Sequence, residues 1–116
     1  MWPSGCRKEK SGVIINMASI AGIDGMAGYT AYGSSKAALI YFTKTLSKEL
    51  ATSGVRVNAV APGLINTEMA KQMEEKAAEK MLEQNGMRRL GNPTEVADLV
   101  LYLSSDSSSF INGQVI

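Results

Sequence analysis

Two short runs of mostly apolar, β-branched residues alternate with longer helical patterns along the chain. Residues 12–18, Gly-Val-Ile-Ile-Asn-Met-Ala, form the first run, and such a run is typical of a strand buried on both faces of a sheet. Residues 55–61, Val-Arg-Val-Asn-Ala-Val-Ala, form the second, and Pro62-Gly63 ends it. Residues 110–116 begin a third run, in which the chain stops. The pattern therefore predicts three strands.

The longest helical pattern covers residues 30–53. Its apolar residues recur at three- and four-residue spacing, whereas Lys44, Lys48 and Glu49 fall on other faces. Gly54 follows, and glycine is the usual residue just past the C-terminus of a helix. The apolar stripe predicted to face the core is Ala38, Leu39, Phe42, Leu46 and Leu50.

Two further helices are predicted in the second half of the chain. A Met- and Glu-rich helical pattern occupies residues 67–85. In residues 92–95, Asn92 can cap a new helix, Pro93 fits its first turn and Glu95 completes a capping box. Strand, helix, strand, helix, strand is the alternation of a parallel sheet covered by helices. The predicted fold class is α/β, and the order of the elements is that of half of a doubly wound parallel sheet, truncated at both ends.

Composition and charge narrow the class of protein. The 116 residues suffice for one small domain, and a net charge of +1 with interspersed Lys and Glu gives no case for binding nucleic acid or an anionic membrane. No apolar run approaches the ~18 residues needed to span a bilayer. Residues 1–10 have no apolar stretch behind their charges and do not resemble a secretory signal. The single cysteine, Cys6, fits a reducing compartment, so we expect the cytoplasm.

The sequence contains no histidine, and this excludes several kinds of chemistry. Nucleophilic schemes that depend on histidine are ruled out, as is every histidine-containing metal site. With one cysteine as well, a structural zinc site is ruled out, and we expect no metal. Any catalysis must use Ser, Tyr, Lys, Asp or Glu.

Tyr32 and Lys36 lie four residues apart at the start of the long helix, so their side chains leave the same face, roughly 5–6 Å apart at Cβ. Free tyrosine is protonated at neutral pH and is then a poor acid/base group. At ~5 Å and an effective dielectric constant of ~20, a lysine cation stabilises a phenolate by about 3 kcal/mol. That would suit Tyr32 for acid/base catalysis. The pair alone is a weak motif, because such pairs are usually surface packing.

Ser19 follows the first predicted strand, where α/β folds hold ligand-facing residues. By itself a serine there is more often a simple turn residue. The combined series is more specific: Ser19, a tyrosine thirteen positions later, a lysine at the same helix start, and a second strand that ends in Asn-x-x-x-Pro-Gly.

This series resembles the short-chain dehydrogenase/reductase family across nearly all of residues 12–116, and it is most similar to the bacterial 3-oxoacyl-[acyl-carrier-protein] reductase-like branch. The resemblance implies the C-terminal half of a Rossmann-type fold, with residues 1–11 as an atypical segment and residues 12–116 as a partial catalytic domain. It is carried by residues 14–19, 32–38, 57–63, 89–93 and 111–114.

The family resemblance implies roles for individual residues. Tyr32 would exchange a proton with the substrate oxygen, and Ser19 would orient and polarise the carbonyl. Lys36 would bind the nicotinamide ribose hydroxyls and favour the ionised tyrosine, so Tyr32 and Lys36 would also contact the cofactor. The implied cofactor is NADP or NAD, with NADP favoured. The loop expected to meet the nicotinamide carboxamide and a neighbouring phosphate contains Pro62, Gly63, Ile65 and Thr67.

Residues 67–85 match the mobile lid that covers the substrate in the family. The lid side chains either line an acyl pocket or pack within the helix, and both alternatives stay open at this point. Residues 22–28 contain glycines at the wrong spacing for a phosphate loop and match the substrate-side loop instead. The lid residues in question are Met69, Met73, Met81 and Leu82.

The resemblance implies a parent oxidoreductase that transfers hydride between NAD(P)H and a small carbonyl or alcohol. One candidate substrate is a 3-oxoacyl group on a carrier protein. Ser53 weakens this substrate assignment, because carrier-protein reductases often have a basic residue at that position. The parent is expected to be a homo-oligomer. Because the glycine-rich phosphate loop would lie upstream, we expect negligible activity from the 116 residues alone.

Two alternatives compete with the oxidoreductase. The first is an inactive, truncated product that only self-associates, through the long helix and the exposed edge of the first strand. The second is a Ser/Lys hydrolase, which is disfavoured because Ser-x-x-Lys would need a serine at Gly33 and no Gly-x-Ser-x-Gly is present.

Overall fold

The computed structural model describes residues 11–116. Its centre is a pair of parallel strands, β1 (Gly12–Met17) and β2 (Val55–Val60), which pair in register from one end to the other. The predicted atypical segment, apart from Ser11, lies outside the described residues, and so does Cys6.

β2 is almost wholly buried, whereas β1 is only half buried along most of its length. The prediction that the first strand is buried on both faces is therefore wrong. Within residues 11–116, β1 pairs with β2 alone, so its other edge has no strand against it. Both strands contact the long helix, but β2 does so more extensively and is also covered by the end of the chain.

The long helix α2 (Thr30–Leu50) continues through a 3-10 turn, Ala51–Ser53, and confirms the helix predicted over residues 30–53. Gly54 ends it with a φ of 74°, a left-handed conformation that residues with a Cβ adopt only at a cost. Leu46 and Leu50 form the core together with Val55 and Val57 of β2.

The predicted apolar stripe of α2 is only partly correct. Ala38 is exposed and Phe42 is 49% exposed, whereas Thr43 and Ser47 are buried. Burial of these hydroxyls costs little because both are hydrogen-bonded. Thr43 Oγ1 donates to Leu39 O at 2.8 Å and Ser47 Oγ donates to Lys44 O at 2.7 Å. The buried face of α2 therefore includes these two small polar residues in place of Ala38 and Phe42.

The third predicted strand is reduced to a single parallel bridge between Ala59 and Val115. The reason is that side-chain amides replace two backbone partners in the residues before the bridge. Asn112 Oδ1 accepts from the backbone N–H of Val57 at 2.8 Å, and Asn58 Oδ1 accepts from that of Gln114 at 2.9 Å. The end of the chain therefore lies beside β2, joined to it and to the residue after it by four backbone hydrogen bonds but without forming a regular strand.

Arg56 connects β2 to the segment that follows the last helix. That helix, α5 (Pro93–Ser104), is followed by a 3-10 turn, Asp106–Ser108. The Arg56 guanidinium donates five hydrogen bonds, at 2.8–3.2 Å, to four backbone carbonyls and one hydroxyl. The acceptors belong to Leu103, Ser105, Ser108 and Ile111.

The helical pattern of residues 67–85 is divided into two helices, α3 (Glu68–Lys71) and α4 (Glu75–Gln84). Thr67 caps α3, since its hydroxyl accepts from Ala70 N at 3.3 Å. Neither helix contains a fully buried residue. Nothing in the sequence explains the break, because no glycine or proline lies between the helices.

The capping box predicted at the start of α5 is confirmed. The backbone N–H of Asn92 donates to Glu95 Oε1 at 2.9 Å, and Pro93 occupies the first turn. Glu95 also accepts two hydrogen bonds from the guanidinium of Arg89, at 2.8 and 2.9 Å. These bonds hold the pKa of Glu95 at about 2, below its ordinary 4.5, with the Arg89 hydrogen bond as the largest cause.

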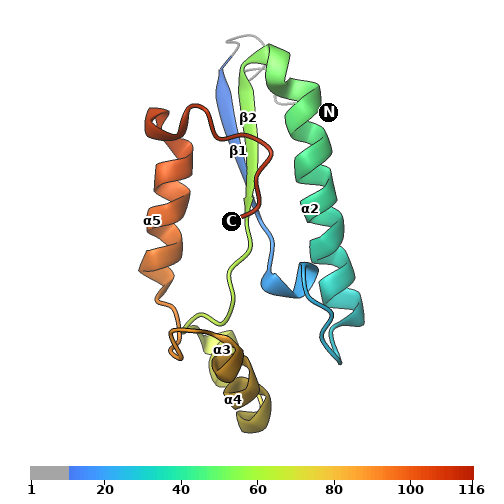
Figure 1. Cartoon of the computed structure of the whole chain (residues 1–116), viewed down its shortest axis with the longest axis vertical. Helices are drawn as coiled ribbons and strands as arrows, with labels where there is room; N and C mark the ends of the chain where they lie inside the picture. Colours follow the sequence, from blue (N-terminus) through green and yellow to red (C-terminus); the bar gives the residue numbers. More distant parts are fainter. Residues whose placement is uncertain (1–10) are drawn as a thin grey trace.

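Figure 1 shows how these elements are arranged: α2 and α5 flank the two strands, and α3 and α4 extend beyond the ends of the strands. The molecule measures 49 × 27 × 22 Å, and its radius of gyration is 15.9 Å. A compact domain of this length has a radius of gyration of about 13 Å. The α3–α4 arm accounts for the elongated shape and forms one wall of the cavities described next.

Candidate functional site

The carboxyl ends of β1 and β2 lie together, and their pairing continues beyond the last strand residues. Ala18 N donates to Val60 O at 2.8 Å, and Ile20 N donates to Pro62 O at 3.0 Å. Ser19 is therefore held beside the loop that begins at Pro62. Ligands of parallel α/β sheets bind at this edge of the sheet.

The segment after Ser19 touches the start of α2 backbone to backbone. Ser19 caps a 3-10 turn, Ile20–Gly22, and its Oγ accepts from Ala21 N at 3.1 Å. A Cβ placed on Gly22 would lie 2.8 Å from the backbone carbon of Lys36, and one on Gly33 would lie 2.8 Å from Ala21 O. Only glycine permits such contacts, so these two glycines fix the distance between the serine turn and the helix.

Tyr32 and Lys36 leave the same side of α2, as their spacing predicts. Lys36 Nζ lies 5.6 Å from the centroid of the Tyr32 ring and donates to Met17 O at 2.9 Å. The carbonyl at the end of β1 thus holds the ammonium against the ring. Tyr32 is 43% exposed, so its ring is accessible to a ligand. Its other neighbour is Tyr29, with ring centroids 6.2 Å apart in an edge-on arrangement.

Ser19, Tyr32 and Gly63 line one cavity of about 310 Å³. The structure thus brings together three candidate site residues from three separate segments. Lys36 does not line this cavity but lies against the Tyr32 ring.

The other candidate cofactor residues lie along the loop that leaves β2. Pro62 contributes its carbonyl to Ile20, as described above. Ile65 makes an isolated bridge with Gly91, and Thr67 caps α3. Pro62, Ile65 and Thr67 are not among the residues that line the cavity with Tyr32. They form the continuous loop from the sheet edge to the α3–α4 arm.

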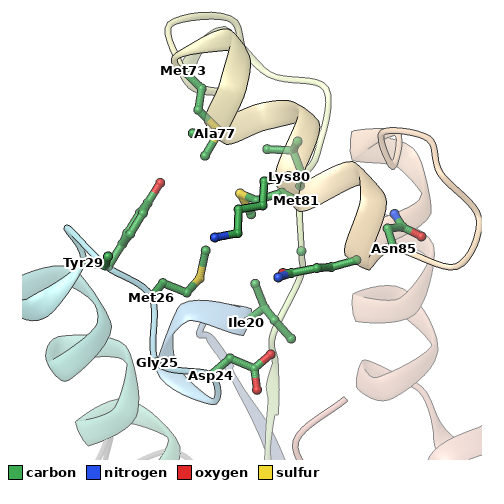
Figure 2. Close-up of a pocket in the computed structure, with 14 residues that line it drawn as sticks. Ile20, Asp24, Gly25, Met26, Tyr29, Met73, Ala77, Lys80, Met81 and Asn85 are labelled. Atoms are coloured by element: carbon green, nitrogen blue, oxygen red, sulfur yellow. The ribbon is translucent and has the colours of Figure 1, made fainter.

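A larger cavity of about 720 Å³ lies next to the first, and Figure 2 shows the side chains around it. The two share a wall that includes Met26, Tyr29, Met73 and Met81. The four lid residues differ in which cavity they line. Met73 and Met81 line both cavities, Met69 lines the smaller one, and Leu82 lines neither.

Met26 and Tyr29 are lining residues that the sequence pattern did not single out. Both lie between the serine turn and α2, in or beside residues 22–28. The available signal was an apolar and an aromatic residue among glycines, on a segment expected to face the substrate.

The described part of the chain contains neither a metal-binding cluster nor a membrane-spanning helix. Residues 11–116 contain no group of three or more His, Cys, Asp or Glu side chains arranged to hold a metal ion. None of the helices over these residues has the length and apolar character needed to cross a bilayer.

Comparison with known proteins gives extensive matches. The family model described as enoyl-(acyl carrier protein) reductase matches residues 3–116. The 3-oxoacyl-[acyl-carrier-protein] reductases of Thermotoga maritima and Aquifex aeolicus are 50% and 47% identical to the chain over 109 residues. Each match covers 94% of this chain and 44% of the relative. The chain therefore spans less than half the length of these relatives.

Solved structures give the same result for the fold. A 3-oxoacyl-[acyl-carrier protein] reductase from Brucella melitensis superposes with a TM-score of 0.91 at 38% identity, covering 97% of this chain and 42% of that one. A xylitol dehydrogenase bound to NAD⁺ superposes with a TM-score of 0.86 at 34% identity, covering 94% of this chain and 48% of that one. The predicted α/β class with a parallel sheet is confirmed.

Proposed function

Because the chain belongs to the short-chain dehydrogenase/reductase family, we propose that it is the active-site part of an oxidoreductase that interconverts a carbonyl compound and its alcohol. The observation that carries the proposal is the cavity shared by Ser19 and Tyr32, with the Lys36 ammonium 5.6 Å from the Tyr32 ring. A hydroxyl, a phenol and an ammonium at one sheet edge are the groups that such a reaction needs from a chain without histidine.

The donors at this edge fit the nicotinamide end of NAD or NADP. Lys36 and Tyr32 would bind the ribose hydroxyls. Gly63 has open space around the position of a Cβ, which lets a flat ring approach its backbone. The loop through Ile65 and Thr67 would meet the carboxamide and a phosphate. When bound, the reduced nicotinamide supplies the hydride.

The chain's own residues would supply the proton and hold the substrate. In reduction, the Ser19 hydroxyl donates a hydrogen bond to the carbonyl oxygen and orients it toward Tyr32. The phenol of Tyr32 would give its proton to that oxygen as the carbonyl carbon is reduced, so that the alcohol would form with charge balanced. The Lys36 cation stabilises the phenolate left behind. Oxidation of the alcohol reverses each step.

Two finer assignments follow from the relatives. We propose a 3-oxoacyl compound as substrate, carried on a protein or a smaller thiol, because several relatives are named for that reaction. We propose NADP ahead of NAD as the cofactor, on the strength of the same branch. NAD-bound structures among the neighbours keep NAD as the alternative.

Association without catalysis is the second candidate. It is favoured by the exposed aromatic side chains on α2, where Tyr41 is 73% and Phe42 is 49% exposed. A parent homo-oligomer would cover this face. Under this candidate the chain self-associates but binds no nucleotide.

The test transplants residues 12–116 into the matching part of the Thermotoga maritima relative, more than half of which lies outside the match. We expect NADPH-dependent reduction of a 3-oxoacyl thioester, and a loss of at least about 100-fold in kcat/KM with Tyr32→Phe. Tyr41→Phe, on an exposed part of α2, is the matched control and should change little. Cofactor binding to the unmodified chain is measured in parallel by NADH and NADPH fluorescence. A folded, cofactor-binding hybrid that is indifferent to Tyr32→Phe would contradict the proposal.

A further inference from the structure

The larger cavity is lined by flexible apolar side chains from both of its walls. Met26 comes from the loop after the serine turn, whereas Met73 and Met81 come from the α3–α4 arm. Methionine is unbranched and adapts to irregular shapes, so a wall of methionines suits a flexible, unbranched chain. A volume of about 720 Å³ is within the range of small-molecule sites.

This cavity lies beside the candidate catalytic groups. Met26, Met73 and Met81 line both this cavity and the smaller one, whose wall includes Ser19 and Tyr32. A molecule whose carbonyl reaches Tyr32 can therefore extend its remote end into the larger cavity. The remote end would meet side chains that the proposed reaction does not use.

One of those side chains is a cation. Lys80 is the only lysine or arginine that lines this cavity, and Figure 2 shows its amine directed inward, toward Met26. Within residues 11–116, the ion pairs are Lys71–Glu68 and Arg89–Glu95, so Lys80 has no carboxylate within 4.0 Å. Asp24 also lines the cavity, at a different part of its wall. An anion would be attracted to Lys80 and repelled by Asp24.

We propose that Lys80 is a specificity residue that binds an anionic group at the remote end of an unbranched apolar substrate. The anion is a carboxylate or a phosphate, and the apolar part lies along Met26, Met73 and Met81. The identification of this ligand as the substrate rests on the function proposed above. Binding of the anionic chain itself depends on neither cofactor nor turnover, so it is measured separately.

The test titrates the 116-residue chain with octanoate and with octan-1-ol, which differ in the charge of the end group. Binding is followed by the methyl NMR signals of the methionines and by calorimetry. We expect octanoate to shift the signals of Met26, Met73 and Met81 and to bind about tenfold more weakly to Lys80→Met. Octan-1-ol should bind both forms alike. Titration with inorganic phosphate and with octyl phosphate then distinguishes a phosphate end group from a carboxylate.

Lys76→Met is the matched control, because Lys76 is an exposed lysine of α4, as Lys80 is, but does not line the cavity. It should bind octanoate as the unmodified chain does. Asp24→Asn removes the repelling charge and should tighten octanoate binding about twofold. Equal loss with Lys76→Met and Lys80→Met would overturn the proposal, as would equal affinity for octanoate and octan-1-ol. An active Thermotoga hybrid that shows either result would retain the proposed function and lose this inference alone.

Discussion

Replacement of Arg56 by methionine should loosen the whole C-terminal part of the fold from β2. The Arg56 guanidinium donates to the carbonyls of Leu103, Ser105, Ser108 and Ile111, as well as to the Ser108 hydroxyl. Methionine keeps a long apolar stem but donates no hydrogen bond. The substitution therefore removes the donors while leaving most of the side-chain volume.

The size of the effect depends on which acceptors keep another donor. Ser105 O still accepts from Ser108 N, Ser108 O from Ile111 N, and Ile111 O from Asn58 Nδ2. Only Leu103 O is left without another donor among the hydrogen bonds of residues 11–116. A hydrogen bond to a charged group contributes about 1.5–3 kcal/mol, and one unsatisfied carbonyl costs a further 1–3 kcal/mol. Because three acceptors remain satisfied, we expect a total loss of about 3 kcal/mol.

Urea unfolding followed by circular dichroism measures this loss. With a slope of about 1.5 kcal/mol per molar urea, the midpoint should fall by about 2 M. Arg56→Lys should lose roughly half as much, because one ammonium cannot reach all four carbonyls. Lys48→Met, an exposed change on α2, should stay within about 0.5 kcal/mol. Hydrogen exchange at Gly113 and Ile116 should accelerate in Arg56→Met. A loss below about 0.5 kcal/mol would refute the reasoning.

Two further predictions concern the start of α5 and the serine turn. The lowered pKa of Glu95 means that its bonds stabilise the fold fully above about pH 4.5 and stop doing so as the pH falls toward 2. The thermal midpoints of the chain and of Glu95→Gln should therefore differ at pH 7 and converge at pH 2, and parallel curves would contradict the assignment. Gly22→Ala puts a Cβ 2.8 Å from the Lys36 backbone, so it should lower the activity of the Thermotoga hybrid about tenfold. Gly86→Ala meets nothing within 4 Å and lines neither cavity, so it should leave the activity unchanged, and equal effects would exclude the Gly22 contact as the cause.

The elements that were predicted correctly are those whose signals are local. The apolar runs gave β1 and β2, and Gly54 and the Asn92 capping box marked the end of one helix and the start of another. The candidate pair Tyr32 and Lys36 was found for the same reason, since four residues on a helix fix its geometry.

The errors arose where distant side chains decide the structure. Hydrophobic periodicity assigned Phe42 to the core, but Thr43 is buried instead, and its Oγ1 accepts a hydrogen bond from Asn16 Nδ2 of β1. The third strand was overestimated because Asn58 and Asn112 bind the backbone across the gap. The lining residues Met26 and Tyr29 acquire their position only when residues 22–28 fold against α2.

The construction of the larger cavity has a consequence for protein engineering. One wall is the serine turn, which two glycine contacts fix against α2. The opposite wall, α3 and α4, contains no fully buried residue and contributes nothing to the Leu46–Val57 core. Residues 69–85 can therefore be randomised in a directed-evolution library with little loss of folded protein. Ligand preference in this scaffold would then diversify while Ser19, Tyr32 and Lys36 stay constant.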